Sequence, residues 1–196
     1  MAHRLWQRSY LCLFNSILIG ALLLVGTACK ESSSKTEETE TVLTYPRLFV
    51  QQDQKELILS RIDREPYQTI LQRIQARAER EARVPGDITW DYGAYGHNGE
   101  IAQANAFLAW LFDDEQAAHK AIELLDLLRD DWETVEQWDV NIRMASSMIG
   151  FTNAWDLLMA TPWFEAESAQ RAREKLLTIA DKFYKRYVVD DFYRAM

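Results

Sequence analysis

A glycine-rich stretch, residues 86–99, holds the side chains best suited to binding a ligand. Four of the seven glycines in the chain lie in it. Between them stand aromatic and hydrogen-bonding residues, namely Trp90, Tyr92, Tyr95, His97 and Asn98. Aromatic faces on a loop that leads into a helix can stack on sugar rings, so the pattern indicates a ligand-binding rim. A long connector whose aromatic residues pack on the domain would show the same pattern, and both interpretations stay open.

A second polar group stands at the start of a helix expected over residues 139–159. It contains Asp139, Asn141 and Arg143. Backbone N–H groups at a helix N-terminus attract anions, and an arginine one turn further on strengthens that attraction. Asn141 and Arg143 are therefore candidate binding residues for a carboxylate or a sulfate. In the alternative interpretation, Asp139 caps the helix and pairs with Arg143 four residues later.

The sequence offers no catalytic triad and no metal centre. His97 and His119 are the two histidines beyond the N-terminal region. Neither has a Ser or Cys partner at a spacing that would indicate a catalytic triad. His119 is expected on a helix surface, which leaves His97 as the better functional candidate. The glycine-rich stretch also lacks the Lys-Ser/Thr ending of a phosphate-binding loop. We therefore assign no catalytic residue, metal or cofactor from these patterns.

Helices are the elements that must position these residues. Apolar residues recur at helical spacing, and proline, glycine and acidic residues mark the ends. No stretch alternates convincingly between apolar and polar residues, so no strand is expected. The expected helices are residues 53–63, a helix opened by Pro66 and ended by Pro85 and Gly86, then residues 99–112, 115–130, 139–159 and 165–187.

Short connections group the last four helices into two antiparallel hairpins, offset by roughly 45 residues. The predicted fold class is all-α, with stacked antiparallel helical hairpins in a partial (α/α) toroid. An open stack exposes an apolar face at each end. Because residues 190–196 still bring aromatic side chains, residues 45–196 are expected to be the N-terminal part of an incomplete toroid domain. Residues 86–99 and 131–138 each precede the first helix of a hairpin, so they should share one rim.

The first 30 residues have the layout of a bacterial lipoprotein signal. A basic start with Arg4 and Arg8 precedes the apolar residues 10–25, and small residues lead to Cys29. The ending Gly26-Thr27-Ala28-Cys29 resembles a lipobox, although Gly26 stands where leucine is usual. Residues 1–28 are therefore predicted to be a signal peptide, Cys29 the lipidated residue, and residues 29–44 a flexible tether. The alternative is an uncleaved membrane anchor, which leaves Cys29 unexplained and has a short apolar run.

Charge and cysteine content exclude several classes of function. The formal net charge is −8, and loss of Arg4 and Arg8 with the signal brings it to −10. Such a chain is a poor nucleic-acid binder. Cys12 would leave with the signal and Cys29 would carry lipid, so no thiol remains as a nucleophile or zinc ligand. We expect a protein of the cell envelope, lipid-anchored to a membrane and periplasmic or outer-membrane.

Motifs within residues 45–190 resemble the N-terminal region of heparinase II/III-like polysaccharide lyases. The motifs are Pro46-Arg47-Leu48-Phe49, Pro66-Tyr67 with the helix after it, Ala106 to Leu111 followed by Asp113-Asp114-Glu115, and Asn153-Ala154-Trp155-Asp156-Leu157-Leu158. The family implies an incomplete α/α toroid followed by a β-sandwich domain. It also implies β-elimination on uronic-acid polysaccharides of the heparin, heparan sulfate or alginate kind. The family's Asn/His-containing helix start is not found in this sequence, so no catalytic residue is carried across.

The resemblance implies the N-terminal toroid region of a lipid-anchored polysaccharide lyase, a carbon–oxygen lyase whose partner is an acidic polysaccharide. The expected substrate-binding residues are Trp90, Tyr92, Tyr95, His97, Asn98, Asn141 and Arg143. Because the base and acid set is not found, this chain by itself is expected to be inactive. The alternative is a non-catalytic helical lipoprotein that binds a glycan or a partner protein.

The lipidation hypothesis predicts that Cys29→Ser abolishes lipid attachment, because the thioether requires the cysteine sulfur. Labelled palmitate should enter the wild-type chain in bacteria and not the variant, which should stay unprocessed or soluble. Cys12→Ser removes the other cysteine and should label normally. Unchanged labelling of the Cys29→Ser chain would contradict the hypothesis.

Overall fold

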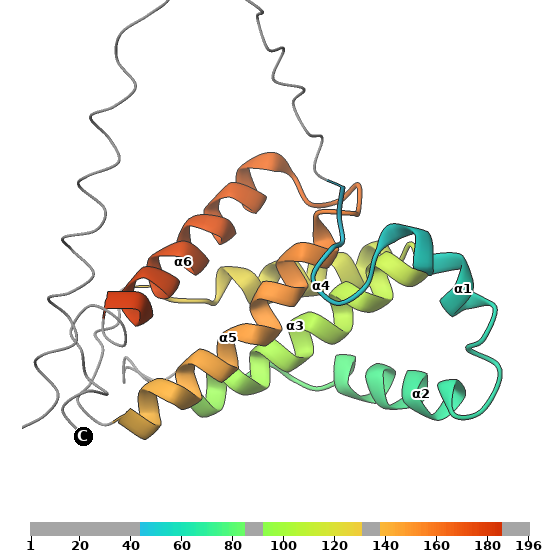
Figure 1. Cartoon of the computed structure of the whole chain (residues 1–196), viewed down its shortest axis with the longest axis horizontal. Helices are drawn as coiled ribbons and strands as arrows, with labels where there is room; N and C mark the ends of the chain where they lie inside the picture. Colours follow the sequence, from blue (N-terminus) through green and yellow to red (C-terminus); the bar gives the residue numbers. More distant parts are fainter. Residues whose placement is uncertain (1–43, 85–91, 131–137, 186–196) are drawn as a thin grey trace, which may run out of the picture. The chain divides into compact units, whose positions relative to one another are not determined.

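All secondary structure in the described part of the chain is helical. The computed structural model describes residues 44–84, 92–130 and 138–185. Figure 1 shows its elements: the 3-10 helix η1 (Gln52–Gln54), α1 (Lys55–Leu59), α2 (Tyr67–Ala78), α3 (Tyr92–Phe112), α4 (Glu115–Asp126), α5 (Trp138–Leu158) and α6 (Ala166–Tyr184). The all-α class expected from the sequence is confirmed.

Helices α3 and α5, the two longest, lie side by side and run in the same direction (Figure 1). Gly96 faces Ser147, and three residues later on each helix Gly99 faces Gly150. This constant offset is what two parallel helices produce. A methyl group on Gly150 would lie 2.4 Å from backbone atoms of Gly99. The two backbones are therefore in contact at this crossing, which glycine permits because it has no side chain.

More than half of the glycine-rich stretch is helix, which corrects the sequence expectation of a loop up to Gly99. Helix α3 begins at Tyr92, so residues 92–99 form about two of its turns. Glycine costs about 1 kcal/mol in a helix relative to alanine, and that cost favoured the loop prediction. Packing against α5 outweighs it. Since no described glycine has a positive φ, Gly96 and Gly99 provide room for the neighbouring helix and do not form turns.

The connection between α3 and α4 is only two residues long. Asp113 takes a left-handed φ of 56°, which turns the chain sharply. The Asp114 side chain accepts a hydrogen bond from the Ala117 N–H at 3.0 Å and so caps the start of α4. Helix α4 returns along α3 and α6 packs against α5, so the described helices form the two expected hairpins.

Two lysines on α6 tie the hairpins together. The Lys175 Nζ donates to the carbonyl of Asp126 at 2.9 Å, and the Lys182 Nζ donates to the carbonyl of Asp130 at 2.7 Å. Asp126 is the last residue of α4, where unpaired carbonyls leave a partial negative charge. An ammonium group at this end satisfies a carbonyl and also offsets the charge.

The predicted helix boundaries agree best with the observed ones in the two hairpins. Helix α5 agrees with residues 139–159 within one residue at each end, whereas α4 stops at Asp126 and not at residue 130. The helix predicted over 53–63 divides into η1, α1 and turns from Ser60 onward. There the Ser60 hydroxyl donates to the Leu57 carbonyl at 2.8 Å, a local bond that competes with helix continuation.

The core forms where α3, α4 and α5 meet. Its largest fully buried side chains include Trp110, Tyr95, Phe151, Ile101, Leu111 and Leu125. None of the described helices has both the length and the apolar character needed to cross a bilayer. The predicted signal peptide, Cys29 and the tether up to residue 43 lie outside the described residues.

One added methyl group at Gly150 should destabilise the fold. The methyl would meet the Gly99 backbone, which cannot rotate away, so α3 and α5 must separate. Overpacking costs about 1–3 kcal/mol or more, against roughly 1 kcal/mol that alanine gains over glycine in a helix. At this severe contact we expect Gly150→Ala to lower the free energy of unfolding by about 2 kcal/mol, measured by chemical denaturation.

Gly96→Ala is the matched control, because its methyl would meet only the Ser147 side chain, at 3.1 Å from Oγ. A side chain can adjust where a backbone cannot, so this variant should change the free energy of unfolding by less than about 1 kcal/mol. Equal losses of unfolding free energy in Gly150→Ala and Gly96→Ala would show that the Gly99–Gly150 contact is no more important for stability than the contact at Gly96.

Candidate functional site

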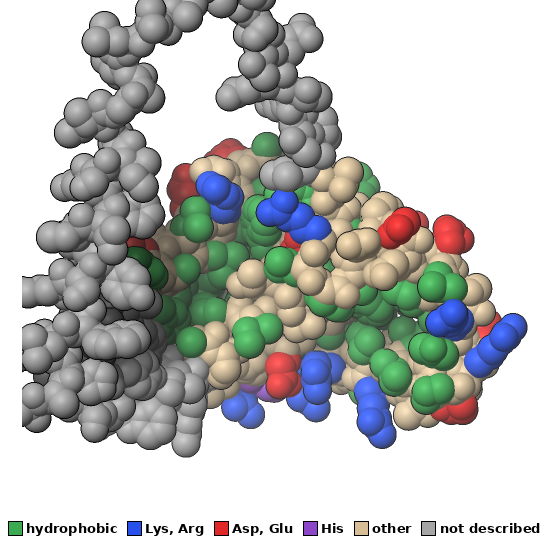
Figure 2. Space-filling model, in the orientation of Figure 1, with side chains coloured by type: hydrophobic (Ala, Val, Ile, Leu, Met, Phe, Trp, Pro, Cys, Tyr) green, Lys and Arg blue, Asp and Glu red, His purple; other side chains and the backbone are tan. Residues whose placement is uncertain are grey.

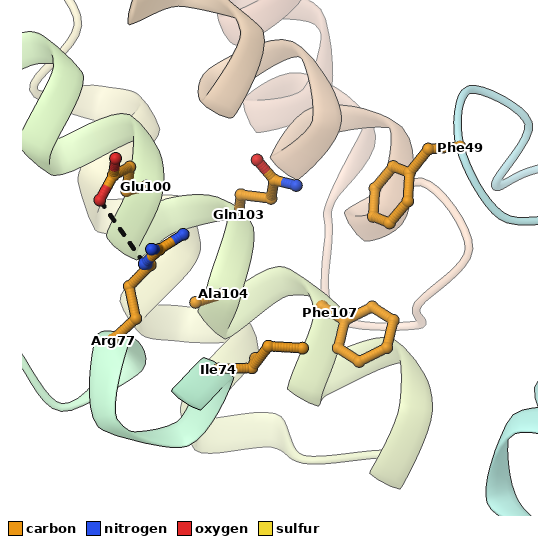
Figure 3. A pocket seen from close by; sticks show the side chains of 7 residues that line it. All are labelled: Phe49, Ile74, Arg77, Glu100, Gln103, Ala104 and Phe107. Atoms are coloured by element: carbon orange, nitrogen blue, oxygen red, sulfur yellow. Dashed lines mark ion pairs between the residues drawn. The ribbon is translucent and has the colours of Figure 1, made fainter. Parts of the chain in front are cut away.

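A hollow of about 180 Å³ lies between α2 and α3. Figure 3 shows its two ends: Phe49 and Phe107 stand at one, and Arg77 and Glu100 at the other, with Gln103 between them. Ile74 and Ala104 complete the lining. The hollow thus combines two aromatic faces, one guanidinium, one carboxylate and one amide, which is a mixture that suits a ligand with apolar faces and polar groups.

A second hollow of about 310 Å³ continues the first toward α5. It shares Arg77, Glu100 and Gln103 with the first and adds α5 residues around Ser146 and Ile149. We call the combined surface the α3 groove; it is lined by Phe49, Ile74, Arg77, Gly96, Glu100, Gln103, Ala104, Phe107, Ser146, Ser147, Ile149 and Gly150.

Helical spacing explains why these residues share a surface. On α3, Gly96, Glu100, Gln103 and Phe107 follow one another at intervals of three or four residues, so they occupy one side of the helix. Ile101 is on another side of α3 and is fully buried in the core. The groove is therefore the side of α3 that α4 and the core leave uncovered.

Arginines give the groove a positive edge in an acidic chain. Arg77 Nε lies 3.5 Å and Arg80 Nη1 3.7 Å from the Glu100 carboxylate. All three side chains are about half exposed, and such ion pairs contribute at most about 1 kcal/mol. Figure 2 shows Lys and Arg side chains spaced along the edge over α2. Both guanidinium groups can therefore exchange Glu100 for an anionic ligand at little cost.

The N-terminal segment, residues 45–50, holds Phe49 at the groove, and we call it the strap. The buried carboxylate of Asp156 accepts hydrogen bonds from the backbone N–H groups of Arg47 (2.8 Å) and Leu48 (3.0 Å). The Tyr45 ring meets Trp155 edge-on at 5.7 Å between centroids. These contacts fix the strap on the end of α5.

Phe49 then reaches α3 from the strap. Its ring stacks on Phe107, with 6.4 Å between centroids and 27° between planes. Nearby, the Trp110 Nε1–H donates to Gln52 Oε1 at 2.8 Å. Phe49, Phe107 and Asp156 were not predicted from the sequence to be parts of one assembly. The available signal was the carboxylate of Asp156, which stands inside an otherwise apolar helix end.

Tyr95 and Asn98, two predicted rim residues, lie inside the molecule. Tyr95 is 1% exposed and belongs to the core, so its ring has no free face for a sugar. Asn98 is 0% exposed. Its amide donates to the Arg83 carbonyl at 2.7 Å and accepts from the Arg83 N–H at 2.8 Å. The expectation that these two side chains bind substrate is corrected: both are buried, and Asn98 fastens the segment before α3.

His97 also fastens that segment. Its Nε2 lies 2.8 Å from the Glu81 carbonyl oxygen, a contact that requires the tautomer with a proton on Nε2. Its side chain is partly exposed, whereas His119 is exposed on α4 as expected. His97 therefore holds residues 81–84 to the start of α3.

The remaining predicted site residues are only partly described. Tyr92, Asn141 and Arg143 lie in the first turns of α3 and α5, but their side chains are outside the described residues, as is the whole of Trp90. The two helix starts lie at the same end of the α3–α5 pair (Figure 1). Substrate binding by these four residues stays a prediction. In the described residues no three His, Cys, Asp or Glu side chains gather as a metal site would require.

Comparison with known protein families, characterised proteins and solved structures found no match to this chain.

Removal of the Asp156 carboxylate should loosen the strap. Asp156→Ala leaves the N–H groups of Arg47 and Leu48 without their acceptor, and a hydrogen bond to a charged group contributes about 1.5–3 kcal/mol. We expect the free energy of unfolding to fall by about 2–3 kcal/mol, measured by chemical denaturation. Asp156→Asn keeps an acceptor oxygen, so its free energy of unfolding should lie between those of the wild type and Asp156→Ala.

Asp181→Ala is the control, because Asp181 is an exposed carboxylate on α6 that pairs with the nearby Lys185. Its removal should change stability by less than about 0.5 kcal/mol. If Asp156→Ala were no worse than Asp181→Ala, the strap would not depend on the carboxylate.

Proposed function

We propose that this chain is the N-terminal toroid region of a lipid-anchored polysaccharide lyase, which acts on uronic-acid glycans by β-elimination. The α3 groove is the observation that carries the proposal. It places aromatic faces and guanidinium groups along one side of a parallel helix pair, with a second helix returning from each. Parallel first helices with returning second helices are also what a toroid requires.

The groove chemistry supports an acidic glycan as the ligand. The faces of Phe49 and Phe107 suit the C–H side of a sugar ring, and Gln103 offers an amide to its hydroxyls. Arg77 and Arg80 suit a uronate carboxylate, because guanidinium groups form charge-assisted hydrogen bonds with carboxylates. β-Elimination requires that the uronate carboxylate be neutralised, and in this proposal the arginines supply that charge.

The motifs behind the family resemblance support the fold more than the chemistry. Two of them, the Pro-Arg-Leu-Phe motif and the helix end with Trp155 and Asp156, contact each other through the strap. They account for how the N-terminal segment is attached to α5. The activity therefore rests on the groove, and the groove is where it must be tested.

Arg77→Met should weaken binding of a uronic-acid oligosaccharide about tenfold, since one charge-assisted contact is worth about 1.4 kcal/mol or more. Glu100→Gln should strengthen binding, because it removes the carboxylate that competes for Arg77 and Arg80. Both effects should shrink at high salt. Calorimetric titration with heparin or alginate oligosaccharides measures both effects. Absorbance of the unsaturated uronate product should stay at background, because this chain by itself lacks the base and acid set.

Arg171→Met is the matched control. Arg171 on α6 is 47% exposed and pairs with Glu167, much as Arg77 is 48% exposed and pairs with Glu100. The control should bind the oligosaccharide as the wild type does. Equal loss in Arg77→Met and Arg171→Met would remove the groove from the proposal.

A further inference from the structure

A larger, polar hollow of about 620 Å³ lies between α2 and α4, with α3 as its floor. Its lining includes Gln75, Glu79, Asn105, Leu108, Gln116 and Lys120. Asn105 stands five residues after Glu100, about 140° further around α3 at about 100° per residue. The hollow is therefore on a different side of α3 from the α3 groove, and it takes no part in the proposed function.

Asn105 presents a buried acceptor without a partner. The side chain is 4% exposed. Its Nδ2 donates to the carbonyls of Ala78 (3.1 Å) and Ile101 (2.9 Å). These two bonds fix the amide orientation, because the flipped amide would point an oxygen at two carbonyls. The Oδ1 atom accepts no hydrogen bond from any residue that the structure describes, and a buried acceptor of this kind calls for a partner.

Lys120 presents an ammonium group without a carboxylate. Its Nζ donates to the Ala78 carbonyl, the same oxygen that Asn105 uses. Lys120 makes no ion pair with any described residue, although it is partly buried. An ammonium group has three donors, so two remain after the bond to Ala78. An unused acceptor and unused donors therefore line the same hollow.

We infer that this hollow binds a neutral sugar. A sugar hydroxyl both donates and accepts, so neighbouring hydroxyls can donate to Asn105 Oδ1 and accept from Lys120. The exposed amides of Gln75 and Gln116 flank the hollow and offer further donors and acceptors. Leu108 supplies an apolar contact for the C–H side of the ring.

Charge selects against an acidic sugar at this place. Glu79 and Asp114 also line the hollow, and Asp114 already uses one carboxylate oxygen, Oδ1, to cap α4. Two carboxylates and one ammonium group thus line the hollow, so its net charge is negative and a uronate would be repelled. The same carboxylates accept hydrogen bonds from neutral hydroxyls. The hollow and the α3 groove thus differ in the charge of the sugar that each takes.

Saturation-transfer-difference NMR on the full chain, solubilised in a sugar-free detergent, tests the inference. The probes are the methyl hexosides of glucose, galactose and mannose, with glucuronate as the anionic comparison. At least one hexoside should give saturable transfer with a dissociation constant on the order of 1 mM. Absence of saturable transfer from all three hexosides would mean that the hollow holds only water, and it would overturn the inference.

Variants assign the signal to the hollow. Lys120→Met should weaken hexoside binding about tenfold. Because Lys120 also contacts α2, the double variant Gln75→Ala with Gln116→Ala provides a second measurement. Both glutamines are exposed, so the fold should be retained while binding falls about fivefold. Unchanged binding in the double variant would overturn the inference.

Arg77→Met separates this site from the α3 groove. It should leave hexoside binding unchanged while it weakens uronate binding, because Arg77 does not line the hollow. Loss of hexoside binding in Arg77→Met would place the neutral sugar in the α3 groove and overturn the inference. Failure of uronate binding alone would count against the proposed function and leave the neutral-sugar site standing.

Discussion

The backbone contact between Gly99 and Gly150 fixes the α3–α5 pair on which the rest of both hairpins packs. It brings α3 and α5 so close that no side chain separates them. Phe151 then packs beside Gly99 and becomes fully buried, and Tyr95 is enclosed one turn earlier on α3. Helix α4 packs mainly against α3 and also contacts α5, and α6 packs against α5. The two hairpins are therefore fixed at their closest point by the absence of side chains, since interiors are packed to a density that leaves no room for additional atoms.

The α3 groove is a product of this arrangement and of the strap. Its lining comes from the strap, α2, α3 and α5, and these segments lie far apart in the sequence. Each attachment is modest: two hydrogen bonds to Asp156, a ring stack, and exposed ion pairs at Glu100. The shape of the groove thus depends on several weak contacts held over a rigid α3–α5 pair.

Much of the fold could be predicted from the sequence, because helical periodicity is a local property. The apolar spacing of α4, α5 and α6 and the Asp113-Asp114 turn gave the hairpins within a few residues. The start of α3 could not be predicted in the same way, since its glycines are helical only because α5 lies against them. The same cause hid the burial of Tyr95. Phe49 was missed as a groove residue because its position depends on Asp156, more than a hundred residues away, and no local pattern connects the two.

The strap also determines how the described helices respond to a pull from the N-terminal side. Force applied at residue 44 first meets the two hydrogen bonds to Asp156 and the edge-on contact between Tyr45 and Trp155. These bonds break one after another when a segment is peeled, whereas α3 and α5 share a core that must open all at once. Tension would therefore detach the strap and withdraw Phe49 from Phe107 before any helix unfolds. The aromatic end of the groove would thus open under load while the helix pair beneath it stays folded.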